Sequence, residues 1–260
     1  RKFRVPAPPR DIEGWPWPVR VRTLGTFRIE VDDEPLTFGR KTPRKPIALL
    51  AALIAFGGRH VPEQKLVDAL WTDDEGDSAG EAFAVSLYRL RKLLVHPDVV
   101  QFADGLVSLD PAQVWVDTWA FDRAVAEAER SDDEGARRAP DRVRQLYRGP
   151  FLPAETASAW SLPMRDRVRG QFLRHVARTG RRHEDAGRLD DAVQLYEQGI
   201  EADALAEALY GGLMRTLHRL GRRAEAMAVF RRLRQTLSVT LGIAPSAASE
   251  QLFEAIRQDG

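Results

Sequence analysis

AFAVSLYRLRKLL, residues 82–94, separates its apolar and basic side chains onto two sides of one predicted helix. One side carries the large apolar residues Phe83, Leu87, Leu90 and Leu94, and the opposite side carries Val85, Tyr88, Arg89 and Lys92. The apolar side would fix the helix to a small core. The outward cations and the apolar contact suit phosphates, guanine edges and thymine methyl groups. The pattern therefore favours a helix that reads DNA, and the alternative is a surface helix with solvated Arg and Lys.

The residues before this helix predict a small sheet and two further helices. Apolar and charged side chains alternate over residues 19–38, which is typical of an antiparallel sheet with one solvated face. The expected strands are 19–24, 26–31 and 36–38, with a turn at 32–35. A first helix is expected from Arg44 to Phe56, before Gly57-Gly58, and a second from about Val61 to Trp71, with Pro62 in its first turn.

A hairpin is predicted after the basic helix. Asp104-Gly105 lies between two apolar-rich runs, 99–102 and 106–109, and glycine supplies the positive φ that a tight turn needs. Sheet, three helices and hairpin, in that order, describe a winged helix.

Four short strings carry a resemblance to a known family. They are Leu24-Gly25-Thr26-Phe27, Arg44-Lys45-Pro46, Leu66-Val67-Asp68-Ala69-Leu70-Trp71 and Tyr88-Arg89-Leu90-Arg91-Lys92-Leu93-Leu94. Residues 19–109 resemble the OmpR/PhoB-type winged helix, in the version found in SARP-type bacterial transcriptional activators. The resemblance implies that residues 82–94 enter the major groove, with base contacts from Val85 and Arg89. Phosphate contacts are expected from Ser86, Tyr88, Arg91 and Lys92.

The predicted wing departs from many members of that family. Residues 97–116 contain no Lys or Arg, and the hairpin tip carries Asp104, which is unfavourable beside DNA phosphates. Either this wing stays off the DNA, or affinity comes from elsewhere. The cations at the entrance of the first helix are either another source of phosphate contacts or part of a solvated loop: Arg40, Lys41, Arg44 and Lys45.

The second half of the chain predicts a helical repeat. Gly187, Ala192 and Tyr196 recur as Gly221, Ala226 and Phe230, each 34 residues later, which is the period of the tetratricopeptide repeat. The expected helices are Asp117 to about residue 130, 163–186, 189–201, 205–220, 223–237 and 246–258. The strings Tyr147-Arg148-Gly149-Pro150-Phe151-Leu152-Pro153 and Leu241-Gly242-Ile243-Ala244-Pro245-Ser246 resemble the bacterial transcriptional activator domain of SARP-type regulators.

The expected fold is therefore mainly α with a small antiparallel β part, a winged helix-turn-helix followed by a tetratricopeptide-like α-helical repeat domain. The expected domains are 19–112 for the winged helix and 113–260 for the repeats. Residues 1–18 are read as an irregular segment from a longer polypeptide, because the chain begins at Arg1 and this part is rich in Pro and Trp.

Composition excludes several classes of protein. The chain has no Cys, which excludes disulfides and thiol catalysis, and its 260 residues carry a net charge of +1, so any DNA surface must be local. We find no phosphate-binding loop, no nucleophile motif and no metal-ligand spacing, and we predict no enzyme activity, no catalytic residue, no cofactor and no metal. We read the histidines as surface or helix-end residues: His60, His96, His175, His183 and His218. No signal peptide or membrane span is visible, which favours the cytoplasm.

The sequence therefore predicts a transcriptional activator that binds double-stranded promoter DNA. The resemblance implies RNA polymerase as a partner, direct repeats as DNA sites, and possible self-association on DNA. The alternative is a protein-interaction or ligand-sensing module whose winged helix binds DNA weakly or not at all. A nucleotide second messenger could bind at three Arg-x-x-Asp strings, although such strings are expected by chance here: 130–133, 138–141 and 188–191.

Overall fold

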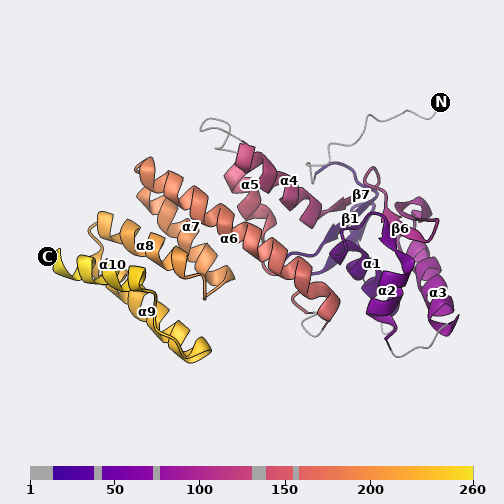
Figure 1. Ribbon diagram of the computed structural model, residues 1–260. Helices are drawn as coiled ribbons and strands as arrows, with labels where there is room; N and C mark the ends of the chain where they lie inside the picture. Colours follow the sequence, from indigo (N-terminus) through magenta and orange to yellow (C-terminus); the bar gives the residue numbers. More distant parts are fainter. Residues whose placement is uncertain (1–13, 38–42, 73–76, 131–138, 155–157, 260) are drawn as a thin grey trace. The chain divides into compact units, whose positions relative to one another are not determined.

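The computed structural model describes residues 14–37, 43–72, 77–130, 139–154 and 158–259 (Figure 1). The chain divides into two compact units, one up to Val168 and one from Arg169, and each is described by itself. The division falls inside the long helix α6, Leu162–Asp185. The expected domain boundary after residue 112 stays a prediction.

The first unit contains a four-stranded sheet in the order β3-β2-β1-β7. Its strands are β1, Val19–Arg22; β2, Arg28–Val31; β3, Glu34–Pro35; and β7, Val114–Val116. The predicted antiparallel pairing of the first strands is confirmed. The parallel pairing of β7 with β1 was not predicted. One face of the sheet packs against the core through the buried side chains of Val19, Val21 and Ile29.

The third strand begins earlier than the sequence predicted. Asp32 and Asp33 have φ of 49° and 68°, so these two residues alone make the turn and pairing resumes at Glu34. We placed this strand at 36–38, which is wrong for 36 and 37, and residue 38 lies outside the described residues. Pro35 is tolerated because β3 is an edge strand.

Three helices and a hairpin follow, as predicted for a winged helix. They are α1, Arg44–Ala55; α2, Glu63–Leu70; α3, Asp77–Leu93; β5, Val100–Ala103; and β6, Leu106–Leu109. The short strand β4, Val61–Pro62, pairs with β6, so Pro62 precedes α2 and does not lie in its first turn as predicted. Extended backbone at Pro62, with ψ of 134°, explains the difference.

Two further helices of the first unit precede α6. Helix α4, Asp117–Arg130, begins where the sequence predicted, and α5, Ala139–Leu146, packs against it. We did not predict α5. The rings of Phe121 and Tyr147 lie 6.0 Å apart and join α4 to the chain that follows α5.

The second unit is a helical repeat, as predicted. Beyond the end of α6 it contains α7, Leu189–Ala202; α8, Glu207–Arg219; α9, Arg223–Leu241; and α10, Ala247–Gln258. Gly187 and Gly221 both have φ of 72° in the turns before α7 and α9. Ala192 and Ala226 are fully buried in the helices that follow.

Tyr196 shows why small residues are needed in this unit. Its ring lies between α6 and α8, and a Cβ on either Gly180 or Gly212 would come within 2.5 Å of the ring carbon Cζ. The Tyr196 hydroxyl donates to Glu184 Oε1 at 2.5 Å. In the next repeat Phe230 stacks on Phe253, with ring centroids 4.3 Å apart, and joins α9 to α10.

Candidate nucleic-acid interface

Helix α3 has the two sides that its sequence predicted. Phe83, Leu87, Leu90 and the following Leu94 are at most 4% exposed. On the other side Val85 is 46% and Tyr88 66% exposed, and Arg89 and Lys92 are exposed as well. No hydrogen bond or ion pair links Arg89 or Lys92 to another residue in the part of the chain that the structure describes. This face is free to meet a ligand with acidic and apolar groups.

Aromatic contacts fix α3 to its neighbours. The Phe83 ring meets the Trp71 ring edge-on, with centroids 6.2 Å apart, and the Phe102 ring at 5.8 Å. Trp71 follows α2, and Phe102 lies on the hairpin strand β5. The side of α3 opposite its exposed face is therefore anchored to both elements that flank it.

Ser86 lies on the less accessible side of α3. Its side chain is 6% exposed, unlike its neighbours Val85 and Tyr88. A phosphate would reach it only at the margin of the exposed face. The phosphate contact expected of Ser86 stays a prediction.

Two of the expected phosphate ligands already donate to backbone oxygens. Arg91 Nε donates to Val100 O at 2.9 Å and ties α3 to the first residue of β5. Lys45 Nζ donates to Leu70 O and lies 5.1 Å from the centroid of the Trp71 ring. Both contacts fix the elements around α3, and sequence reasoning gave no sign of them. Their phosphate contacts stay predictions.

Of the three remaining cations at the entrance of α1, the structure describes one, Arg44. Arg44 is exposed and has no hydrogen bond or ion pair with any described residue. Arg40 and Lys41 lie outside the described residues. Of the two described cations in this cluster, Arg44 is the one whose side chain is not already bonded to a described residue.

The hairpin forms as predicted, with Asp104 and Gly105 at φ of 52° and 70°. Gly105 O accepts a hydrogen bond from Glu63 N at 2.9 Å, so the turn lies beside the start of α2. Ala103, Asp104 and Gly105 are all exposed. The exposed carboxylate at this tip would repel DNA phosphates that came close to it.

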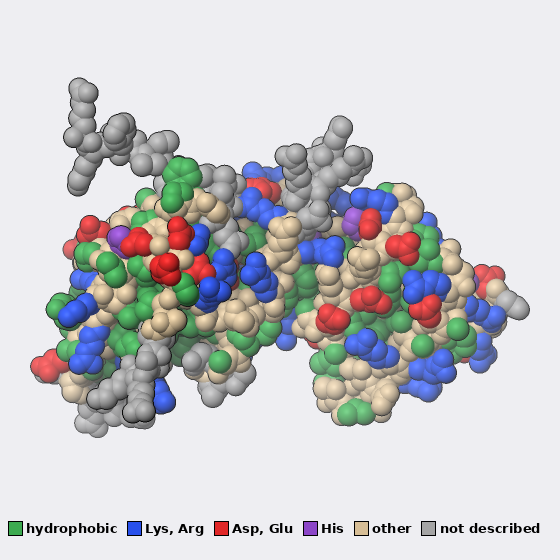
Figure 2. All heavy atoms as spheres, turned by 180° about the vertical axis from the view of Figure 1, so that it is seen from behind, with side chains coloured by type: hydrophobic (Ala, Val, Ile, Leu, Met, Phe, Trp, Pro, Cys, Tyr) green, Lys and Arg blue, Asp and Glu red, His purple; other side chains and the backbone are tan. Residues whose placement is uncertain are grey.

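Charge on the surface is mixed. On the face shown in Figure 2, Lys and Arg side chains are interspersed with Asp and Glu. In the sheet, Glu30 accepts from Arg20 at 2.8 Å and from Arg22 at 2.7 Å, and lies 3.0 Å from Arg28. Burial raises the pKa of Glu30, but hydrogen bonds from Arg22 and Arg20 hold it below the usual value. These sheet arginines are partnered by carboxylates and are poorer candidates for DNA contacts than Arg44 and Arg89.

A buried carboxylate lies at the end of β1, and the sequence did not reveal its role. Asp117 is 3% exposed and accepts hydrogen bonds from Thr23 N at 2.6 Å, Thr23 Oγ1 at 2.7 Å, Leu24 N at 2.8 Å and Thr118 N at 2.8 Å. Burial raises the pKa of Asp117 to about 6, and the hydrogen bonds from Leu24, Thr23 and Thr118 limit the rise. This carboxyl joins the start of α4 to the two residues that follow β1.

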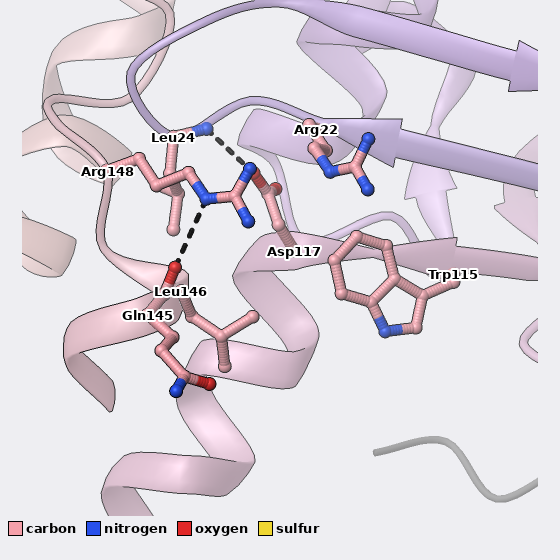
Figure 3. Close-up of a pocket in the computed structure, with 7 residues that line it drawn as sticks. All are labelled: Arg22, Leu24, Trp115, Asp117, Gln145, Leu146 and Arg148. Carbon is pink, nitrogen blue, oxygen red and sulfur yellow. Dashed lines mark hydrogen bonds between the residues drawn. The ribbon is translucent and has the colours of Figure 1, made fainter. Parts of the chain in front are cut away.

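The hollow beside Asp117 is too small for a ligand. Figure 3 shows Arg148 and Trp115 around it, with Arg148 Nε donating to Gln145 O at 3.2 Å. Its volume is about 10 Å³, the room of one water molecule. The site therefore has a structural role.

The histidines do not form a metal site in the described residues. His60 is exposed, and His96 and His218 pair with Asp32 at 2.8 Å and Asp259 at 2.9 Å. His175 is 2% exposed in the middle of α6, so reading it as a surface or helix-end residue was wrong. It follows Phe172 by three residues and precedes Thr179 by four, and both are buried on the same side.

Two further expectations concern ligands and membranes. The residues Arg188, Asp190 and Asp191 of the third Arg-x-x-Asp string are exposed at the start of α7, and the other two strings extend outside the described residues. A nucleotide site there stays a prediction. None of the described helices is long and apolar enough to cross a membrane.

The chain is similar to known bacterial regulatory proteins over most of its length. A family model described as "Bacterial transcriptional activator domain" matches residues 116–257. Two proteins named Regulatory protein AfsR, from Streptomyces coelicolor and Streptomyces griseus, are 30% and 29% identical to the chain and cover 92% and 97% of it. The chain spans only 24% and 26% of their length. Regulatory protein DnrI of Streptomyces peucetius is 28% identical, over 82% of this chain and 84% of its own.

The fold is also found among solved structures. One of them is Mycobacterium tuberculosis EmbR in complex with a low affinity phosphopeptide, with a TM-score of 0.67 and 24% identity. The match covers 94% of this chain and 66% of that one. A winged helix followed by helical repeats therefore occurs in a protein of known structure.

Proposed function

Since the chain belongs to the bacterial transcriptional activator domain family and is of the SARP type, we propose that it binds promoter DNA and activates transcription. The observation that carries the proposal is the exposed face of α3, where Val85, Tyr88, Arg89 and Lys92 lie opposite a buried stripe. Residues 19–112 are the DNA-binding domain, and 113–260 are the activator domain. The protein acts in the cytoplasm and activates transcription through contact with RNA polymerase. Its DNA sites are direct repeats, on which copies of the protein associate with one another.

The exposure of the α3 residues supports the following roles for them. Arg89 donates to a guanine edge, and Val85 packs on a neighbouring base, where a thymine methyl suits it. Lys92 and Tyr88 contact phosphates beside them, and Arg44 contacts a phosphate at the start of α1. The first test is fluorescence anisotropy with mixed duplex DNA over a series of salt concentrations. A steep loss of affinity with salt supports phosphate contacts, and no binding at low salt contradicts the proposal.

Replacing Arg89 by Ala is expected to weaken binding to a selected DNA site by about 1–3 kcal/mol, with a much smaller loss on random duplex. The reason is that a bidentate contact with guanine is lost only where the sequence supplies that base. The measurement is anisotropy on both DNAs at one salt concentration. Arg231→Ala, which removes an exposed arginine from α9, is the matched control and should leave both affinities unchanged. Equal losses on both DNAs for Arg89→Ala would make Arg89 a phosphate contact.

Replacing Arg44 by Ala is expected to flatten the slope of log affinity against log salt by about 0.9, the contribution of one neutralised phosphate. Arg44 suits this test because its side chain is exposed and has no partner among the described residues. An unchanged slope contradicts the phosphate contact.

Lys45→Ala and Arg91→Ala are compared in the same series, because Leu70 O and Val100 O already accept from their side chains. A flatter slope shows that they also reach phosphates. A lower affinity at unchanged slope shows that Lys45 only holds α2 against α1, and that Arg91 only holds the wing against α3.

The second candidate function is a regulatory module that binds a protein or a small ligand. The exposed Asp104 at the wing tip favours it, because a carboxylate there opposes DNA binding. Tight binding of a polymerase subunit or a nucleotide, without any salt-sensitive DNA affinity, would favour this function over the first.

A further inference from the structure

Three helices of the repeat unit form one continuous surface. Helix α8 lies between α6 and α10, because Arg215 of α8 is 3.6 Å from Glu184 of α6, and His218 of α8 is 2.9 Å from Asp259 after α10. Glu207 at the start of α8 also accepts hydrogen bonds from Ser246 at the start of α10. The residues that α6 and α8 leave exposed between these contacts therefore belong to the same surface.

Arginines dominate the α6 and α8 part of this surface. Arg174, Arg178 and Arg181 recur every three or four residues on α6, and Arg215 and Arg219 do so on α8. All but the half-buried Arg178 are exposed. Within the part of the chain that the structure describes, Arg215 faces Glu184, and the other four have no hydrogen bond or ion pair. We call these five residues the arginine surface.

The two rows of the arginine surface lie close together. Arg215 and Arg181 both act electrostatically on the Tyr196 hydroxyl, whose pKa is raised by burial and by its bond to Glu184 and is lowered by these two arginines. Glu184 supplies one carboxylate between them and is itself 7% exposed. The guanidinium of Arg178 adds a buried Nε without a partner. Asp185 is exposed on the same face of α6, four residues after Arg181, so the five guanidinium groups still outnumber the carboxylates of Glu184 and Asp185.

Small side chains leave the guanidinium groups accessible. Ala177 on α6 and Ala208 and Gly211 on α8 lie on the same faces as the arginines. Arg215 Nη1 lies 3.7 Å from the point where a Cβ on Gly211 would be, so the side chain lies back along its own helix. An extended chain could approach the two helices without displacing a large side chain.

We propose that the arginine surface binds a short acidic segment of a partner protein. Guanidinium groups form paired, charge-assisted hydrogen bonds with carboxylates, which suits Asp and Glu side chains at successive positions of an extended peptide. DNA fits less well, because its phosphates continue along the whole duplex. A duplex on this surface would bring phosphates close to Glu250, which is exposed on the next helix, α10, and repels them. Binding here does not depend on DNA binding by α3, so either can fail alone.

The test uses the full chain and a fluorescein-labelled peptide of alternating Glu and Ala, with a Lys and Ala peptide of equal length as the charge control. The double variant Arg174→Ala/Arg181→Ala should weaken binding of the Glu peptide about tenfold, because two charge-assisted contacts are lost. Neither arginine has a partner among the described residues, so folding should be retained. The matched control is Arg231→Ala/Arg232→Ala on α9, which removes the same charge from exposed positions and should change binding less than about twofold.

Four outcomes would overturn the proposal. The first three are no saturable binding of the Glu peptide, equal binding of the Lys peptide, and equal losses of affinity in the two double variants. The fourth is that random duplex DNA displaces the peptide and that Arg174→Ala/Arg181→Ala weakens the binding of this DNA. The last outcome would assign the surface to nucleic acid. DNA binding measured separately with Arg89→Ala reports on α3, so failure of one proposal is distinguishable from failure of the other.

Discussion

Replacing Asp117 by Ala is expected to lower the free energy of unfolding of the first unit by about 3–5 kcal/mol at about pH 4.5. The side chain accepts from three backbone N–H groups, those of Thr23, Leu24 and Thr118, and all three residues are buried. Alanine leaves these donors without a partner, and each unpaired buried donor costs about 1–3 kcal/mol. The small hollow beside the carboxyl leaves little room for water to replace it.

The decrease in the free energy of unfolding caused by Asp117→Ala should become smaller as the pH rises. Burial raises the pKa of Asp117 from 3.8 to about 6, so the folded protein binds this proton more tightly than the unfolded chain does. The carboxyl therefore stabilises the fold most when it is protonated, below the pKa of the unfolded chain. That contribution is lost as the pH rises through about 6. The difference between wild type and Asp117→Ala should narrow by about 2 kcal/mol between about pH 4.5 and pH 7.5.

Urea unfolding followed by tryptophan fluorescence measures this difference. All six tryptophans lie before Val168, so the signal reports on the first unit. Asp98→Ala, at an exposed carboxyl, is the control and should change stability by less than about 0.5 kcal/mol at either pH. A difference that stays constant or widens with pH would contradict a raised pKa for Asp117.

The fold of this chain was predictable where its signals are local. The spacing of Phe83, Leu87, Leu90 and Leu94 fixes which side of α3 is buried, and Asp104-Gly105 fixes the hairpin turn. The 34-residue spacing predicted the repeats, because each repeat must meet the same packing needs as the one before.

Features that depend on distant partners were not predictable. Asp117 meets Thr23 across 94 residues, so its sequence context shows only a residue that can begin a helix. The pairing of β7 with β1 has the same cause. In the candidate interface, exposure of Val85 and Arg89 followed from helical spacing. The bonds of Arg91 and Lys45 to carbonyl oxygens did not, because a backbone acceptor has no signature in the sequence.

Replacing Phe83 by Ala is expected to lower the free energy of unfolding of the first unit by about 3–5 kcal/mol and to weaken specific DNA binding in the molecules that remain folded. Phe83 is 1% exposed, and its ring contacts both Trp71 and Phe102. Removing the ring leaves a cavity and releases α3 from the two elements that hold it. Because base contacts tolerate little displacement, the loss of DNA affinity should be larger on a selected site than on random duplex.

Phe102→Ala is the matched control, because it removes the other ring of the same contact from a position that is 40% exposed. It should cost about 1 kcal/mol, since less apolar surface is lost and no closed cavity forms. Stability is measured by urea unfolding, and DNA binding by anisotropy at a temperature where each variant is folded. If Phe83→Ala costs no more than Phe102→Ala, the buried stripe does not anchor α3. If stability falls but the ratio of the affinities for the selected site and for random duplex is unchanged, contacts other than the Phe83 ring hold α3 in the position that binds DNA.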